Sequence, residues 1–133
     1  TEGHLIADEL LEDGARTIVG PIISERCKPE LRNHTIETAG VLNKAGVPMC
    51  ICTDHPVVPE QYLPLSAGLA VRGGLDREEA LKAITIYPAQ ITGIADRVGS
   101  IEPGKDADIV IFSGDPLSVC DTPDTVIVNG KVI

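Results

Sequence analysis

Val47-Pro48-Met49-Cys50-Ile51-Cys52, followed directly by Thr53-Asp54-His55-Pro56, is the stretch that decides the fold. Side chains alternate between the two faces of a strand, so Cys50, Cys52 and Asp54 are expected to share one face. Both faces of the segment are largely apolar, which predicts a parallel strand covered by helices. Asp54 then lies at the carboxyl end of a parallel strand, where ligands and catalytic groups collect in α/β folds.

A purely structural role for Asp54 is the alternative. Asp readily starts a turn or caps a helix, because its side chain accepts hydrogen bonds from backbone N–H groups. Its position after the strand is compatible with both roles, and the pattern by itself leaves both open.

The flanking sequence alternates between helical and strand patterns. Helical periodicity predicts helices over residues 3–13, 35–45, 63–72 and 77–85. A run rich in Ile and Val predicts a strand over residues 17–23, in addition to the apolar strand over residues 47–53. Gly14, Gly46 and the Gly73-Gly74 pair mark helix ends. The order predicts parallel strands joined by crossover helices.

The last third of the chain has a different character. Residues 107–112 have high β propensity, and residues 126–128 and 131–133 flank Asn129-Gly130, a strong signal for a two-residue hairpin. This part is predicted to be antiparallel β. We therefore expect two domains, residues 1–96 and residues 97–133.

The tail carries a long and specific family pattern. It comprises residues 98–112, 114–117 and 126–132, and the match extends upstream through residues 53–56 and 78–85. Together these segments resemble the C-terminal part of the amidohydrolase superfamily of metal-dependent hydrolases, closest to its imidazolonepropionase-like branch.

The resemblance implies an α/β fold: the C-terminal part of a (β/α)8 TIM-type barrel, with its last two strands and helices, followed by short antiparallel strands of a small β-sandwich. A complete barrel of this kind needs about 250 residues, and this chain has 133 and no initial Met. We therefore expect a fragment. The family's His ligands would precede Thr1.

For Asp54, the resemblance implies a metal-contacting residue that also shuttles protons. A carboxylate beside a metal-activated water can accept its proton and return it to a departing nitrogen. The resemblance implies one or two divalent ions in the full-length protein, zinc before manganese or iron, and none held by this fragment alone. His55 and Tyr62 are candidate substrate contacts, with loop packing as the alternative for each.

The expected function is hydrolysis of a non-peptide C–N bond in a small molecule, such as a cyclic amide of the imidazolone type. A prolidase-like dipeptidase or an aminohydrolase (deaminase) is the near alternative within the superfamily. A non-catalytic scaffold is the alternative from another class. The isolated chain is expected to be inactive, because a catalytic metal needs about three protein ligands.

Composition narrows the range of partners. Eleven Lys and Arg against 20 Asp and Glu give a formal net charge of −9, which disfavours nucleic acid and anionic membranes as partners. No apolar run approaches the ~20 residues of a membrane span and no signal-peptide pattern begins the chain, so a cytoplasmic location is expected. Unpaired barrel strands predict self-association.

The remaining chemistry-bearing side chains are expected to be structural. Cys50 and Cys52 lie on an apolar strand without Cys-x-x-Cys spacing, which favours buried thiols over a metal or redox site. His4 and His34 are expected to be solvated or to cap helices.

Overall fold

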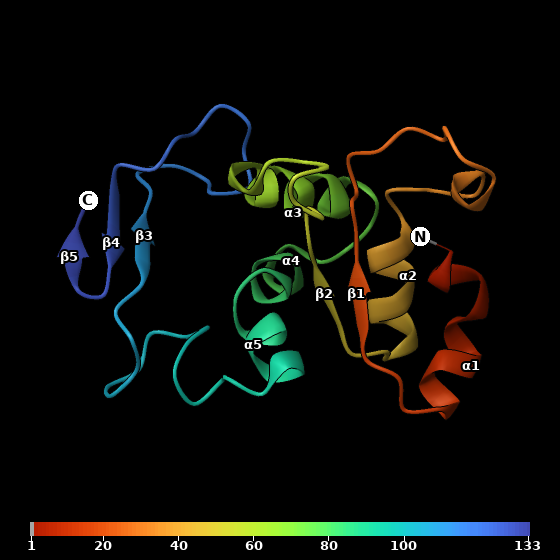
Figure 1. Cartoon of the computed structure of the whole chain (residues 1–133), viewed down its shortest axis with the longest axis horizontal. Helices are drawn as coiled ribbons and strands as arrows, with labels where there is room; N and C mark the ends of the chain where they lie inside the picture. Colours follow the sequence, from red (N-terminus) through yellow and green to blue (C-terminus); the bar gives the residue numbers. More distant parts are fainter. Residues whose placement is uncertain (1) are drawn as a thin grey trace.

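A computed structural model describes residues 2–133, in which a layer of helices and two strands lies beside a small antiparallel sheet (Figure 1). In chain order, with η for 3-10 helices, the elements are η1 (Gly3–Ile6), α1 (Ala7–Glu12), β1 (Thr17–Val19), η2 (Pro29–Leu31), α2 (Thr38–Ala45), β2 (Met49–Ile51), η3 (Glu60–Tyr62), α3 (Leu63–Arg72), α4 (Arg77–Ala83), α5 (Ile86–Thr92), β3 (Ile109–Ile111), β4 (Thr125–Val128) and β5 (Lys131–Val132). Within this part of the chain, no helix is long and apolar enough to cross a membrane.

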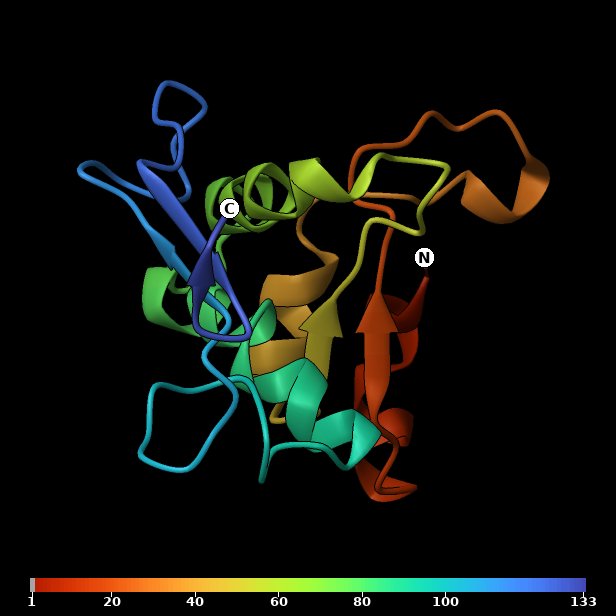
Figure 2. The same cartoon turned by 60° about the vertical axis from the view of Figure 1, so that its left-hand side comes forward.

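The parallel pair of strands is confirmed. β1 and β2 run parallel, with Thr17 opposite Met49 and Val19 opposite Ile51. The connection between them contains α2, as a crossover requires. β2 packs against α2, α3, α4 and α5, and Figure 2 shows α2 behind the two strands and α5 in front of them. This arrangement buries β2 more deeply than β1.

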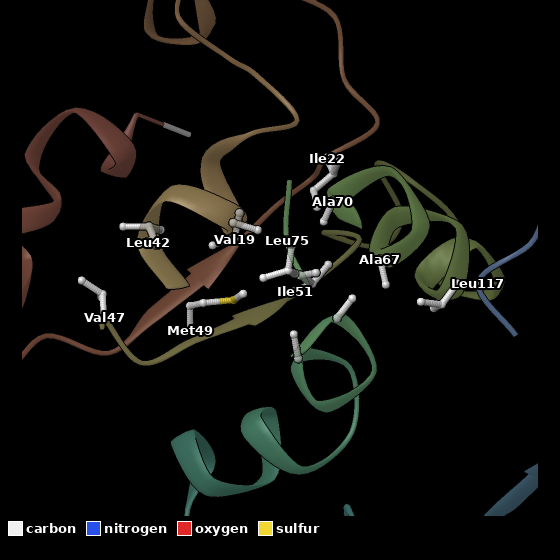
Figure 3. Close-up of a cluster of buried hydrophobic side chains, with 13 residues drawn as sticks. Val19, Ile22, Leu42, Val47, Met49, Ile51, Ala67, Ala70, Leu75 and Leu117 are labelled. Carbon is white, nitrogen blue, oxygen red and sulfur yellow. The ribbon is translucent and has the colours of Figure 1, made fainter. Parts of the chain in front are cut away.

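Apolar side chains from the strands and the helices form one core (Figure 3). Its buried members are Val19, Ile22, Ala39, Leu42, Val47, Met49, Ile51, Ala67, Ala70, Leu75, Ala80, Ala83 and Leu117. Many of the helical members are alanines, which bring the helices close to the strands because they add little side-chain volume. Ile18, on the other face of β1, is 61% exposed.

Both parallel strands are shorter than predicted. β1 stops at Val19 instead of residue 23, because Pro21 has no N–H to continue the ladder. β2 covers Met49–Ile51 instead of residues 47–53, since only the short β1 pairs with it. Two further backbone bonds extend the pairing, Thr17 N–H to the Pro48 carbonyl and Cys52 N–H to the Val19 carbonyl, each 2.9 Å long.

The four predicted helices are present and differ from the prediction mainly at their ends, whereas α5 (Ile86–Thr92) was not among them. α3 has the predicted bounds, whereas the first turn of the predicted N-terminal helix is the 3-10 helix η1. α2 begins at Thr38, after a turn in which the Thr35 hydroxyl accepts a hydrogen bond from the Glu37 N–H. α4 begins as expected after Asp76, whose carboxylate accepts from the N–H groups of Glu78 and Glu79.

The antiparallel tail is also confirmed. β3, β4 and β5 form a separate sheet in that order, which lies at one side of the molecule in both views (Figures 1 and 2). Asn129 and Gly130 have φ angles of 51° and 74°, the left-handed conformation of a two-residue hairpin turn. Leu117 anchors the segment between β3 and β4 in the core, and Arg77 of α4 forms an ion pair of 2.6 Å with Asp115.

Candidate functional site

The chain changes direction just beyond the carboxyl end of β2. Thr53 is 6% exposed, and the next residue, Asp54, is exposed with a φ of 57°. The N–H of Val57 donates to the Asp54 carbonyl at 2.9 Å, which closes a turn. The predicted alternation of faces therefore ends before Asp54, because its backbone is not extended.

The left-handed backbone of Asp54 is unusual for a residue with a side chain. Such a conformation costs a non-glycine residue roughly 1–3 kcal/mol and is concentrated at functional sites, although Asp tolerates it better than most residues. The carboxylate of Asp54 makes no hydrogen bond and no ion pair with any of the described residues 2–133. The backbone of Asp54 thus forms a turn, but its carboxylate accepts none of the backbone N–H bonds that the structural alternative required among residues 2–133. The side chain stays available to another group.

Two thiols lie beneath this turn. Cys50 is 3% exposed and Cys52 is half-buried. Burial is the main cause that raises the pKa of both thiols. For Cys52, a backbone hydrogen bond from Asp54 lowers the pKa in part, and the nearby Asp54 carboxylate adds a smaller increase. Both thiols are therefore protonated at neutral pH, as expected of structural cysteines.

Gly20 lets the two strand ends approach each other. A Cβ atom at this position would lie 2.2 Å from the carbonyl oxygen of Cys52 and 2.7 Å from its sulfur. Only glycine fits between the end of β1 and the end of β2. The loops that follow the two strands therefore leave from neighbouring points.

His55 and Tyr62 lie on the loop that joins β2 to α3. Both side chains are exposed, Tyr62 by 44%. No hydrogen bond or ion pair joins them to Asp54 among residues 2–133. The structure places the three predicted site residues on one loop, but the described contacts do not bring their side chains together.

The loop that leaves β1 contributes residues that the sequence did not single out for this end of the sheet. The Nε2 of His34 donates to the Pro21 carbonyl at 3.0 Å, and Arg26 donates to the His34 carbonyl at 2.8 Å. His34 is thus a partly buried support for the loop instead of a solvated side chain. His4 is also structural, since its Nδ1 shares a hydrogen bond of 3.0 Å with the Thr38 hydroxyl.

The side chains of this chain do not fit a metal centre by themselves. Over residues 2–133 there is no group of three or more His, Cys, Asp or Glu side chains that could hold a metal ion. A catalytic zinc site needs about three protein ligands, and the exposed turn offers the single carboxylate of Asp54.

A family model matches nearly the whole of this chain, and curated relatives match half of it or more. The model of the amidohydrolase family matches residues 6–133. The amidohydrolase tasK of Hapsidospora irregularis is 34% identical over 103 residues, which are 77% of this chain and 10% of that protein. The imidazolonepropionase of Geobacillus kaustophilus is 47% identical over 72 residues, which are 52% of this chain and 17% of that protein.

Solved structures share the fold. An amidohydrolase from Thermotoga maritima MSB8 superposes with a TM-score of 0.95 and 41% identity, covering 100% of this chain and 35% of that one. A zinc-bound adenosine deaminase from Xanthomonas campestris, 24% identical with a TM-score of 0.63 over 96% of this chain and 34% of that one, shows a likeness of fold alone.

The parallel strands, the crossover helix and the separate antiparallel sheet fit a partial TIM barrel. The chain spans about a third of the length of the Thermotoga protein and less of the curated relatives. On these matches, the chain belongs to the amidohydrolase family and fits its imidazolonepropionase-like branch.

Proposed function

We propose that this chain is the carboxyl-terminal part of a longer metal-dependent hydrolase that cleaves a non-peptide C–N bond in a small molecule. A cyclic amide of the imidazolone type is the favoured substrate, because the imidazolonepropionase of Geobacillus kaustophilus is 47% identical over the matched residues. The observation that carries the proposal is the unpaired carboxylate of Asp54, held on a left-handed turn at the carboxyl end of β2.

In this proposal Asp54 is the residue of the chain that moves a proton. Hydrolysis of a C–N bond requires a base for the attacking water and an acid for the departing nitrogen, and one carboxylate can serve both steps in turn. An exposed, unpaired carboxylate has both lone-pair edges free for these contacts. His55 and Tyr62, on the same loop, are proposed to contact the substrate.

The metal would depend on the rest of the protein. We propose that Asp54 supplies one ligand and that the remaining ligands lie outside this chain, since residues 2–133 hold no metal-binding group. Zinc is the proposed metal, as one or two ions. We further propose that residues 1–96 are the last two strands and helices of the barrel, that residues 97–133 belong to the β domain, and that the protein is cytoplasmic.

The test is the activity of the whole protein with Asp54→Asn, which keeps the size and the turn tendency of the side chain but removes its basicity. We expect kcat on an imidazolone substrate to fall at least 100-fold, because proton transfer typically contributes about 10²–10⁴-fold. Asp13→Asn, an exposed acid at the end of α1, is the matched control and should leave kcat unchanged.

Equal activity of Asp54→Asn and the native protein would refute the role of Asp54. Cleavage of dipeptides or deamination of an aminated heterocycle, without turnover of the imidazolone, would show that the substrate is of the kind used by another branch of the family. The isolated 133-residue chain should show no turnover, and hydrolysis by it alone would contradict the proposed need for further ligands.

A further inference from the structure

A concave site lies at the opposite end of the parallel strands from Asp54. It is a cavity of about 460 Å³ between the end of α2, the amino end of β2 and α5. The lining residues that the argument uses are Arg16, Asn43, Val47, Met49, Tyr87 and Gln90. Val47 and Met49 precede the carboxyl end of β2, so the cavity and the Asp54 turn are separate places in the fold.

The cavity has the size and the walls of a small-molecule site. Pockets for small ligands hold about 300–1,000 Å³ and are mainly apolar, with a few polar groups that orient the ligand. Val47 and Met49 are each 2% exposed. The part of the cavity wall that they form is therefore held in place by the packing of the core. A hydrocarbon group placed against them would be removed from water without displacing any protein contact, which favours binding.

The polar side of the cavity is held in place by hydrogen bonds. The hydroxyl of Tyr87 donates to Oε2 of Glu79 at 2.6 Å, and Nδ2 of Asn43 donates to the same oxygen at 3.2 Å. Lys82 donates to the other oxygen at 2.8 Å. Glu79 is thereby paired with a cation and two neutral donors, so its charge is compensated and does not exclude an anion from the cavity.

Arg16 supplies positive charge at the edge of this cavity. Its exposed guanidinium makes no hydrogen bond and no ion pair within residues 2–133, although the whole chain carries a net charge of −9. The side-chain amide of Gln90 also has no partner in that part of the chain. A guanidinium binds carboxylates through two parallel N–H donors, which gives both strength and orientation.

We propose that this cavity binds a small organic monocarboxylate with a hydrocarbon body. The carboxylate pairs with Arg16, and the hydrocarbon body packs against Val47 and Met49. A single guanidinium matches the single charge of a carboxylate better than the double charge of a phosphate ester. The site is independent of the hydrolysis proposed for Asp54 and lies at the other end of the strands.

Titration with cyclohexanecarboxylate and with its neutral analogue cyclohexanecarboxamide tests this proposal. Calorimetry on the 133-residue chain measures the affinities, and amide chemical shifts locate the bound molecule. We expect the carboxylate to bind at least tenfold more tightly than the amide and to shift the resonances of Asn43 and Gln90, while those of Asp54 and His55 stay in place.

Two variants distinguish the effect of the charge on Arg16 from the effect of removing any exposed positive charge. Arg16→Met should abolish the preference for the carboxylate. Arg32→Met removes an exposed arginine from the connection between η2 and α2 and should retain the preference. Both arginines are without a side-chain partner among residues 2–133, so neither change breaks a contact of the fold.

Equal binding of the carboxylate and the amide, or an equal effect of the two variants, would overturn the proposal. So would shifts confined to the Asp54 loop. Calorimetry is repeated on the longer protein proposed above. Binding to the 133-residue chain but not to the longer protein would mean that another part of the polypeptide fills the cavity. The proposed ligand would then be wrong.

Discussion

Asp54 combines an exposed carboxylate with a left-handed backbone, and these two properties can be separated by mutation. Asp54→Gly removes the carboxylate and suits the positive φ, so the free energy of unfolding should stay within about 1 kcal/mol of the native value. Asp54→Val removes the carboxylate and places a β-branched residue in the left-handed region. This change should lower the free energy of unfolding by roughly 1–2 kcal/mol. Urea denaturation of the two variants measures the difference.

Identical stability of Asp54→Gly and Asp54→Val would show that the turn relaxes and that the backbone at this position is not constrained. Both variants lack the carboxylate and should be equally inactive in the whole protein. A loss of activity in Asp54→Val alone would indicate that the turn matters and the carboxylate does not.

The four thiols differ in exposure, and this difference predicts their reactivity. Cys27 and Cys120 are exposed, whereas Cys50 is buried and Cys52 half-buried. Iodoacetamide at neutral pH should therefore label Cys27 and Cys120 first, and peptide mass spectrometry would show at least a tenfold difference in rate from Cys50. Because the pKa values of Cys50 and Cys52 are raised, their labelling should increase as the solution becomes more alkaline.

Unfolding in urea is the control, since it should make all four thiols react at similar rates. Rapid labelling of Cys50 in the folded chain would mean that β2 is not covered by its helices.

At the scale of elements, the contact between α3 and the tail depends on one glycine. A Cβ atom at Gly68 would lie 2.5 Å from the carbonyl oxygen of Leu117, which is a backbone atom and cannot rotate away. Gly to Ala inside a helix normally stabilises by roughly 0.5–1 kcal/mol. Here the clash should reverse the sign, so we expect Gly68→Ala to lower the free energy of unfolding by more than about 1 kcal/mol.

Gly3→Ala is the control, because the nearest atom to its added Cβ is a side-chain methyl of Leu10 at 3.5 Å, an ordinary contact. Thermal unfolding of the two variants measures the effect. Stabilisation by Gly68→Ala would mean that the tail does not pack on α3 at Leu117.

At the scale of the whole molecule, the two-stranded parallel sheet leaves each strand with one edge unpaired by the rest of residues 2–133. Ile18 of β1 is also largely exposed. Unpaired edges and apolar surface favour association between chains. We therefore expect the isolated chain to form dimers or larger species at micromolar concentration, as measured by light scattering.

Ile18→Lys tests whether β1 carries this contact. A charge on that strand should shift the distribution toward monomer, whereas Ile101→Lys, at an exposed site on the connection before β3, should not. A monomeric native chain at the same concentration would contradict the expectation.

The sequence by itself determined the order and type of most elements. Periodicity and turn chemistry act over a few residues, so α3, the capping of α4 by Asp76 and the Asn129-Gly130 hairpin could all be predicted correctly. The apolar run before Asp54 placed this residue at the end of a parallel strand for the same reason, and the family pattern of the tail identified the superfamily.

Only the tertiary structure decided where the strands end, how Asp54 is held and what surrounds Arg16. The lengths of β1 and β2 depend on their mutual register, and the room beside Cys52 depends on Gly20, which is distant in sequence. Asn43, Glu79 and Tyr87 meet across three helices, and Asn43 and Tyr87 line the cavity beside Arg16. Contacts between residues so far apart follow from packing, because no local pattern records which helix faces which.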